Sequence, residues 1–75
     1  MNRESNIYSI SHRVMGKKLR AARQNAGLNQ RAAASFLSTS QSRISKIELS
    51  QCHIDAIELA ALAKVYKKQI KYFLS

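Results

Sequence analysis

The chain has 75 residues, of which 45% are hydrophobic, and it contains no proline. A chain of this length forms at most one domain with a modest core. Its formal net charge of +9 favours a polyanionic partner, which can be nucleic acid, an anionic membrane or an acidic protein. The sequence shows no apolar run long enough to span a membrane and no signal peptide, so we expect a cytoplasmic protein that does not act at a membrane.

The reactive side chains of the sequence are few. Cys52 is the single cysteine, so an internal disulfide cannot form. It stands beside His53, but the chain lacks the further ligands at workable spacing that a zinc ion needs. The four acidic residues and two histidines show no catalytic spacing, and no phosphate-binding loop is present. We therefore expect neither an enzyme nor a bound metal or other cofactor.

The N-terminal part of the chain divides into an arm and a helix. Residues 1–11 are mixed and polar, and we interpret them as an arm before a single domain in residues 12–75. Apolar residues then recur at helical spacing and predict a first helix over 12–26. These residues are Met15, Leu19, Ala22 and Ala26. Gly27 supplies the left-handed residue that ends many helices. Gly16, inside the helix, indicates either a close backbone approach or a tolerated defect.

Two short helices follow, each with a residue suited to cap it. Asn29 and Ser40 are good N-cap residues and predict helices over 30–37 and 41–49. The apolar face of the first of these consists of Ala33, Ala34, Phe36 and Leu37. The second helix is anchored to the body by Ile44 and Ile47.

Two further helices complete the predicted fold. Asp55 caps a helix over 56–66, whose inward side chains are Ala56, Leu59, Leu62, Ala63 and Tyr66. A short helix over 69–74 offers Ile70, Phe73 and Leu74 to the core. Five short helices with tight connections predict an all-α domain. The second and third helices are joined by a turn of about three residues, which is typical of a helix-turn-helix motif.

The outer face of the third helix suits the DNA major groove, because its side chains are short and polar. Gln41 can pair with the N6/N7 edge of adenine, and Arg43 or Lys46 can donate to guanine O6/N7. Ser42 and Ser45 can donate to or accept from several bases. The alternative interpretation of this face, taken by itself, is a solvated helix surface.

Several segments resemble, in one register, the lambda repressor/Cro-type helix-turn-helix family, also called the XRE family. They are MGKKLRAARQNAGLNQ, Ala34, SQSRISKIE, DAIELAALAKVY and QIKYFL, and they span residues 15–74. The resemblance implies a compact five-helix, lambda-repressor-like domain. It implies that base and phosphate contacts come from Asn29, Gln30, Gln41, Ser42, Arg43, Ser45 and Lys46, and that Gln30 and Gln41 pair with each other. It also implies a structural ion pair between Arg23 and Glu48.

The sequence departs from the family pattern at three places. Ser38 replaces the usual turn glycine, so it adopts either a strained positive φ or a slightly different turn. Thr39 stands where an aliphatic residue normally packs. The segment 50–53 replaces a glycine-led basic loop that often touches phosphate, and only Gln51 and His53 remain there as donors.

These observations predict a sequence-specific regulator of transcription that binds double-stranded DNA, with a repressor as the expected type. Because one small domain makes few base contacts, we expect a homodimer on a pseudo-palindromic operator. The candidate dimer surface is C-terminal and consists of Tyr66, Ile70, Tyr72, Phe73 and Leu74, although these residues can also simply complete the core.

Further candidate phosphate contacts are Lys17, Lys18, Arg20, Arg31, Gln51 and His53. The N-terminal arm can follow a groove through Arg3, support dimerisation through Ile7, Tyr8 and Ile10, or do neither. The alternative function is an antitoxin, whose main partner is a protein toxin, or a restriction–modification controller.

Overall fold

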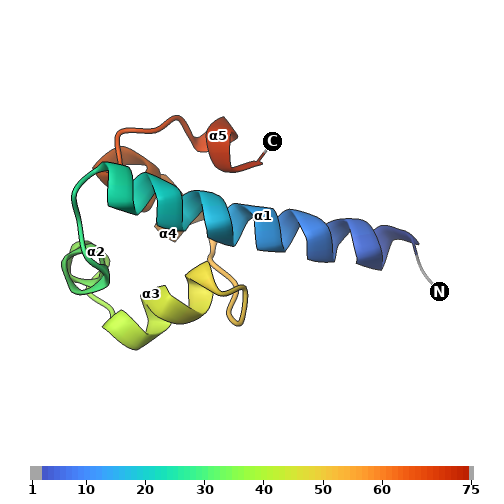
Figure 1. The fold of residues 1–75 in the computed structure, drawn as a ribbon, viewed down its shortest axis with the longest axis horizontal. Coiled ribbons are helices and arrows are strands. Elements are labelled where there is room, and N and C mark those ends of the chain that lie inside the picture. The colour runs from blue at the N-terminus through green and yellow to red at the C-terminus, as the bar shows by residue number, and fades with distance from the viewer. Residues whose placement is uncertain (1–2, 75) are drawn as a thin grey trace.

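The computed structural model describes the backbone of residues 3–74 and the side chains of residues 12–74. Its helices are α1 (Arg3–Asn25), α2 (Gln30–Phe36), α3 (Gln41–Glu48), α4 (Ala56–Val65) and α5 (Ile70–Leu74). The described residues contain no strand. Helix α1 is the longest element, with α3 on one side of it and α5 on the other, and both helices contact it (Figure 1). The predicted all-α, five-helix fold is confirmed.

Helix α1 is longer than the sequence predicted. It begins at Arg3 rather than at His12, so the backbone of residues 3–11 is helical and extends away from the other four helices (Figure 1). The physical reason is that this segment contains neither proline nor glycine to interrupt a helix that is already formed beyond it. The side chains of Arg3, Ile7, Tyr8 and Ile10 lie outside the described residues, so their suggested roles stay predictions.

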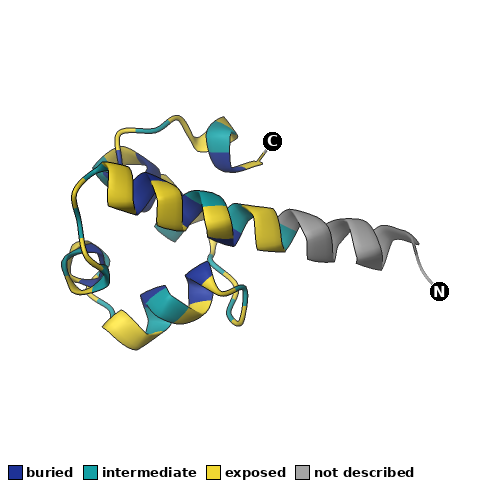
Figure 2. Cartoon of the chain, in the orientation of Figure 1, coloured by how far each residue is buried: buried dark blue, intermediate teal, exposed yellow. Residues whose placement is uncertain are grey.

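The core is one cluster to which all five helices contribute buried residues (Figure 2). Its buried apolar residues are Leu19, Ala22, Ala33, Ala34, Ile44, Ile47, Leu59, Leu62, Ala63, Tyr66 and Phe73. The small side chains of Ala33 and Ala34 are 0% and 3% exposed. Side chains this small allow α2 to pack close to its neighbours on that side.

Four residues predicted to point inward are instead exposed, and the prediction was wrong for them. Phe36 is 58% exposed, because it lies about 200° around α2 from the buried Ala34. Ala56 is exposed at the first position of α4. Ile70 and Leu74 are 40% and 62% exposed, since α5 is only long enough to bury one side, which Phe73 occupies.

The first four helices all end with one residue in the left-handed conformation. These residues are Gly27, Ser38, Ser50 and Lys67, with φ values of 74°, 52°, 61° and 60°. At the end of α2, the Ser38 N–H donates to Ser35 O (3.3 Å) and the Thr39 N–H donates to Ala34 O (3.0 Å). This pair of bonds is the Schellman motif. Of the two alternatives for the turn, Ser38 therefore adopts the positive φ.

The glycine inside α1 lies where the backbone of α1 closely approaches the C-terminal end of α3. A Cβ atom added to Gly16 would lie 2.7 Å from Glu48 O and 3.0 Å from Ile47 O. Both are backbone atoms at the C-terminal end of α3. Of the two explanations for Gly16, the close backbone approach is the correct one, and it sets how near the end of α3 lies to α1.

Candidate nucleic-acid interface

The helix-turn-helix unit is built by local capping and by two buried isoleucines. Asn29 Oδ1 accepts a hydrogen bond from the Ala32 N–H (2.8 Å) and caps α2. Ser40 Oγ accepts one from the Arg43 N–H (3.1 Å) and caps α3. Ile44 and Ile47, 1% and 3% exposed, hold α3 against the core. The helix therefore presents its opposite side to solvent.

That outer side carries the short polar side chains that the sequence predicted. Gln41, Ser42 and Lys46 are exposed, and Ser45 is half-buried. No bulky side chain stands among them until Leu49, which caps the C-terminal end of α3 and is 59% exposed. A helix with such a surface can enter a groove about 12 Å wide without steric conflict.

A chain of polar contacts connects the core to the first residue of α3. Arg23 Nε and Nη2 donate to the two carboxylate oxygens of Glu48 at 2.7 and 3.1 Å. Gln30 Nε2 donates to Glu48 Oε1 at 3.1 Å, and Gln41 Nε2 donates to Gln30 Oε1 at 3.4 Å. Arg23 Nη1 also donates to Leu28 O at 2.9 Å. The ion pair and the glutamine pair implied by the family resemblance are thus parts of one connected network.

The two charged members of this network are buried. Arg23 is 8% exposed and Glu48 is 7% exposed. The hydrogen bond from the guanidinium to Glu48 raises the pKa of Arg23 above its ordinary value, although burial acts in the opposite direction. Arg23 therefore stays charged at any accessible pH and acts as a structural residue at the base of the site.

A hollow opens at the solvent end of the network. It has a volume of about 420 Å³ and is lined by Arg23, Asn29, Gln30, Arg31 and Gln41. Four of these five residues were predicted to contact DNA or to pair with those that do. The fold therefore brings the start of α2 and the start of α3 to one concave surface, where amide and guanidinium donors surround a space open to solvent.

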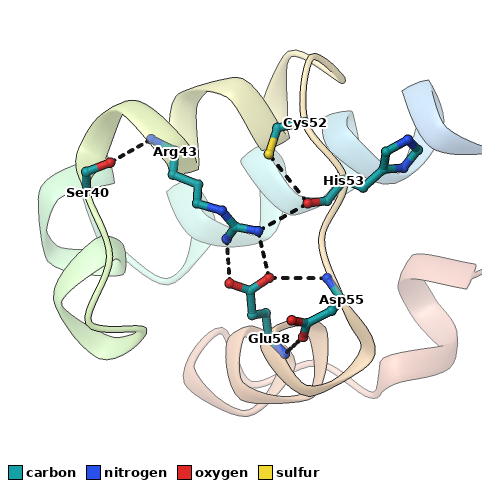
Figure 3. A network of polar contacts seen from close by, with 6 residues as sticks. All are labelled: Ser40, Arg43, Cys52, His53, Asp55 and Glu58. Atoms are coloured by element: carbon teal, nitrogen blue, oxygen red, sulfur yellow. Dashed lines mark hydrogen bonds and ion pairs between the residues drawn. The ribbon is translucent and has the colours of Figure 1, made fainter.

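Arg43 differs from its predicted place on the outer face. Its guanidinium turns toward α4, where it donates to both carboxylate oxygens of Glu58, one of them at 2.9 Å, and to the carbonyl oxygen of His53 at 3.2 Å (Figure 3). The bond to Glu58 raises the pKa of Arg43. The same carboxylate also accepts from the Asp55 N–H at 3.2 Å and completes a capping box at the start of α4. Arg43 therefore ties α3 to α4 instead of facing a base.

The candidate phosphate contacts separate into two groups. Lys17, Arg20, Arg31, Gln51 and His53 are exposed, as a phosphate contact requires. Lys18 is half-buried on the α5 side of α1, where its Nζ donates to Tyr72 O (3.0 Å) and lies 5.3 Å from the centre of the Tyr72 ring. Because α5 and α3 lie on opposite sides of α1 (Figure 1), Lys18 lies on the side of α1 that faces away from the recognition helix. The ring of His53 packs on that of His12, with centroids 4.6 Å apart.

The candidate dimer surface is smaller than predicted. Tyr66 and Phe73 are 3% and 2% exposed, so they belong to the core and cannot form part of a surface. Ile70 and Leu74 are exposed, and Tyr72 is half-buried.

The Tyr66 hydroxyl has no hydrogen-bond partner among the described residues. Burial, followed by the nearby charge of Glu48, raises the pKa of Tyr66 to about 12.

A sequence model described as a helix-turn-helix domain matches residues 14–68 of the chain. The chain belongs to this helix-turn-helix family. The match covers residues 14–25 of α1 and all of α2, the turn, α3 and α4. Helix-turn-helix domains bind double-stranded DNA and place the second helix of the motif in the major groove. Among curated proteins and among solved structures, no match is found.

For this helix-turn-helix domain, sequence reasoning missed the contact between Arg43 and Glu58. The signal was present, because Asp55 and Glu58 have the spacing of a capping box. That spacing places the Glu58 carboxylate at the start of α4, beside the loop that follows α3.

Within the part of the chain that the structure describes, no helix is long and apolar enough to cross a membrane.

Proposed function

We propose that this helix-turn-helix protein is a sequence-specific transcription regulator of the lambda repressor/Cro type, and that it represses by occupying a pseudo-palindromic operator as a homodimer. The observation that carries the proposal is the polar outer face of α3, whose first residue is held by Gln30, Glu48 and Arg23. A base-reading side chain gains specificity when it is positioned before binding, because less conformational freedom is lost in the complex.

Gln41 is the principal base-reading residue in this proposal. Its amide can make two hydrogen bonds to adenine N6 and N7, and the bond from its Nε2 to Gln30 restricts the freedom of the side chain. Lys46, exposed five residues further along α3, donates to guanine. Ser42 and Ser45 supply shorter contacts. Arg43 is excluded from this set, because base contact would break its two bonds to Glu58.

Phosphate contacts position the domain but carry no sequence information. Asn29, Gln30 and Arg31 border the hollow at the start of α2 and supply donors to the backbone of one strand. Gln51 and His53 are exposed beyond the end of α3 and can donate to phosphate oxygens.

The homodimer follows from the small number of base contacts that one domain makes. Two copies related by a two-fold axis would read half-sites about 34 Å apart. Exposed Ile70 and Leu74 of α5 are the apolar residues that we assign to the interface between copies. A bound dimer over a promoter excludes polymerase without any further contact, which is why repression is the proposed outcome.

The test is a selection of bound sequences from a random duplex library at about 150 mM salt. Recovery of an inverted repeat with half-site centres one helical turn apart supports the proposal. The Gln41→Ala variant should lose about 1–3 kcal/mol of discrimination at one base position of each half-site, while Lys64→Ala on α4 should select the same site as the parent. Recovery of unenriched sequence by the parent protein would contradict the proposal and direct the search to a protein partner.

A further inference from the structure

Three hollows follow one another along the side of α3 that faces α1. The first is the hollow of about 420 Å³ at Gln30 and Gln41. The second, of about 350 Å³, shares Arg23 and Gln30 with the first. The third, of about 270 Å³, shares Arg20 and Leu49 with the second. Neighbouring hollows have lining residues in common, and we call the three together the α1–α3 trough.

One wall of the trough is an edge of α3. Gln41 lines the first hollow, Ser45 the second, and Leu49 the second and third. These residues are four positions apart, so they lie in a row along one side of the helix. The proposed base-reading surface and the trough therefore share an edge. A DNA strand that flanks α3 on this side lies in the trough.

The other wall carries a row of exposed cations. Arg31 lines the first hollow, Arg20 the second and third, and Arg13 and Lys17 the third. On α1, Arg13, Lys17 and Arg20 have the spacing of one helix face, with rises of about 6 Å and about 4.5 Å along the axis. Glu48 is the one carboxylate among the lining residues of the three hollows, and Arg23 neutralises it.

The loop after α3 cannot provide these charges. Residues 50–55 contain neither lysine nor arginine. Ser50 instead fixes the loop against α1 by donating from Oγ to His12 O at 3.3 Å. Ser50 and Leu49 line the third hollow together with Arg13 and Lys17. The cations that line the third hollow therefore come from α1.

An α-helix about 10–12 Å across fills a major groove about 12 Å wide. The sugar–phosphate backbones must then pass along the two flanks of the helix. We propose that the backbone of one DNA strand lies in the α1–α3 trough, where Arg20, Lys17 and Arg13 contact its phosphates in turn. The inference rests on the proposed function, because it requires α3 to occupy the groove. It adds that α1 serves as the phosphate clamp at the C-terminal end of the recognition helix.

The experiment compares two variants that each remove two positive charges. Arg13→Gln/Lys17→Gln removes them from the trough, and Lys64→Gln/Lys71→Gln removes them from exposed positions on α4 and α5, which line none of the three hollows. The affinity for a mixed-sequence duplex of about 30 base pairs is measured from about 50 to 200 mM salt. Circular dichroism and thermal unfolding establish that both variants fold like the parent.

Each phosphate contact contributes about 0.9 to the slope of log affinity against log salt concentration. The trough variant should lower the magnitude of this slope by about 2, and each of its single substitutions by about 1. The control should leave the slope unchanged. Equal slopes for the two double variants, a slope in the trough variant like that of the parent, or no binding of the duplex by the parent would each overturn the phosphate clamp. The duplex has no selected sequence, so this experiment tests the phosphate clamp alone. The proposed sequence-specific function is tested separately, by whether the library selection enriches an operator.

Discussion

Arg23 of α1 and Glu48 of α3 form a buried, two-point ion pair, with N–O distances of 2.7 and 3.1 Å. The same Glu48 oxygen that accepts from Arg23 Nη2 also accepts from Gln30 at 3.1 Å. One carboxylate therefore joins three elements of the domain, α1, α2 and α3. Its position couples the stability of the fold to the placement of the side chain that we assign to base reading.

Removing one partner of this ion pair should destabilise the domain strongly. Arg23→Ala or Glu48→Ala leaves an unpaired buried charge, which costs about 3–5 kcal/mol of unfolding free energy. The double variant Arg23→Met/Glu48→Leu should be markedly more stable than either single variant, because both charges are removed together. Urea unfolding followed by circular dichroism measures all three, with Lys64→Ala as the surface control. A double variant as unstable as the sum of the two single variants would contradict the coupling.

Substitution of Gly16 by alanine should destabilise the protein although alanine favours helices. The added Cβ would lie 2.7 Å from a backbone carbonyl oxygen of α3, so one of the two helices must move. Overpacking of this kind costs about 1–3 kcal/mol. Ala21→Gly, at an exposed position of α1, is the reference and should lose only about 0.5–1 kcal/mol. Thermal unfolding compares the two, and a higher melting temperature for Gly16→Ala would show that the close approach is absent.

Glycine at position 67 should stabilise the domain. Lys67 has a φ of 60° at the end of α4 and is exposed, so the backbone strain is removed without loss of a packed side chain. We expect a gain of about 0.5–1 kcal/mol in unfolding free energy, since glycine adopts this conformation without steric penalty but loses more entropy on folding. Lys64→Gly, three residues earlier and inside α4, should lose a similar amount. The pair is measured by urea unfolding, and the same sign for both variants would argue against strain at Lys67.

The buried Tyr66 hydroxyl should make stability fall at high pH. Its pKa rises from 10.0 to about 12 in the folded protein, mainly through burial. The unfolded chain therefore releases this proton first, and the contribution is fully present below pH 10 and is lost as pH rises toward 12. Each pKa unit corresponds to about 1.4 kcal/mol, so the loss approaches about 3 kcal/mol. Tyr66→Phe should show a shallower decline of unfolding free energy between pH 10 and 12. Identical pH profiles for the variant and the parent would contradict burial of the hydroxyl.

Local interactions explain which features could be read from the sequence. The N-caps at Asn29, Ser40 and Asp55 each depend on one side chain and a backbone N–H three residues away, so they can be recognised without knowledge of the fold. The spacing of Ile44 and Ile47 likewise settles which side of α3 is buried. The ion pair between Arg23 and Glu48 is not local, and it was predicted only through resemblance to a family.

Tertiary structure decided the features that depend on how much neighbouring surface is available. Phe36 fits an apolar pattern but is 58% exposed, because it lies about 200° around α2 from the buried Ala34. Arg43 has the position of a base-reading residue, yet the loop after α3 brings Glu58 within hydrogen-bonding distance of its guanidinium. Short-range periodicity and capping thus determined the order of the helices in this domain, although not the start of α1. The packing of those helices decided which of their polar side chains remain available to DNA, because a salt bridge across two elements forms only after both have been placed.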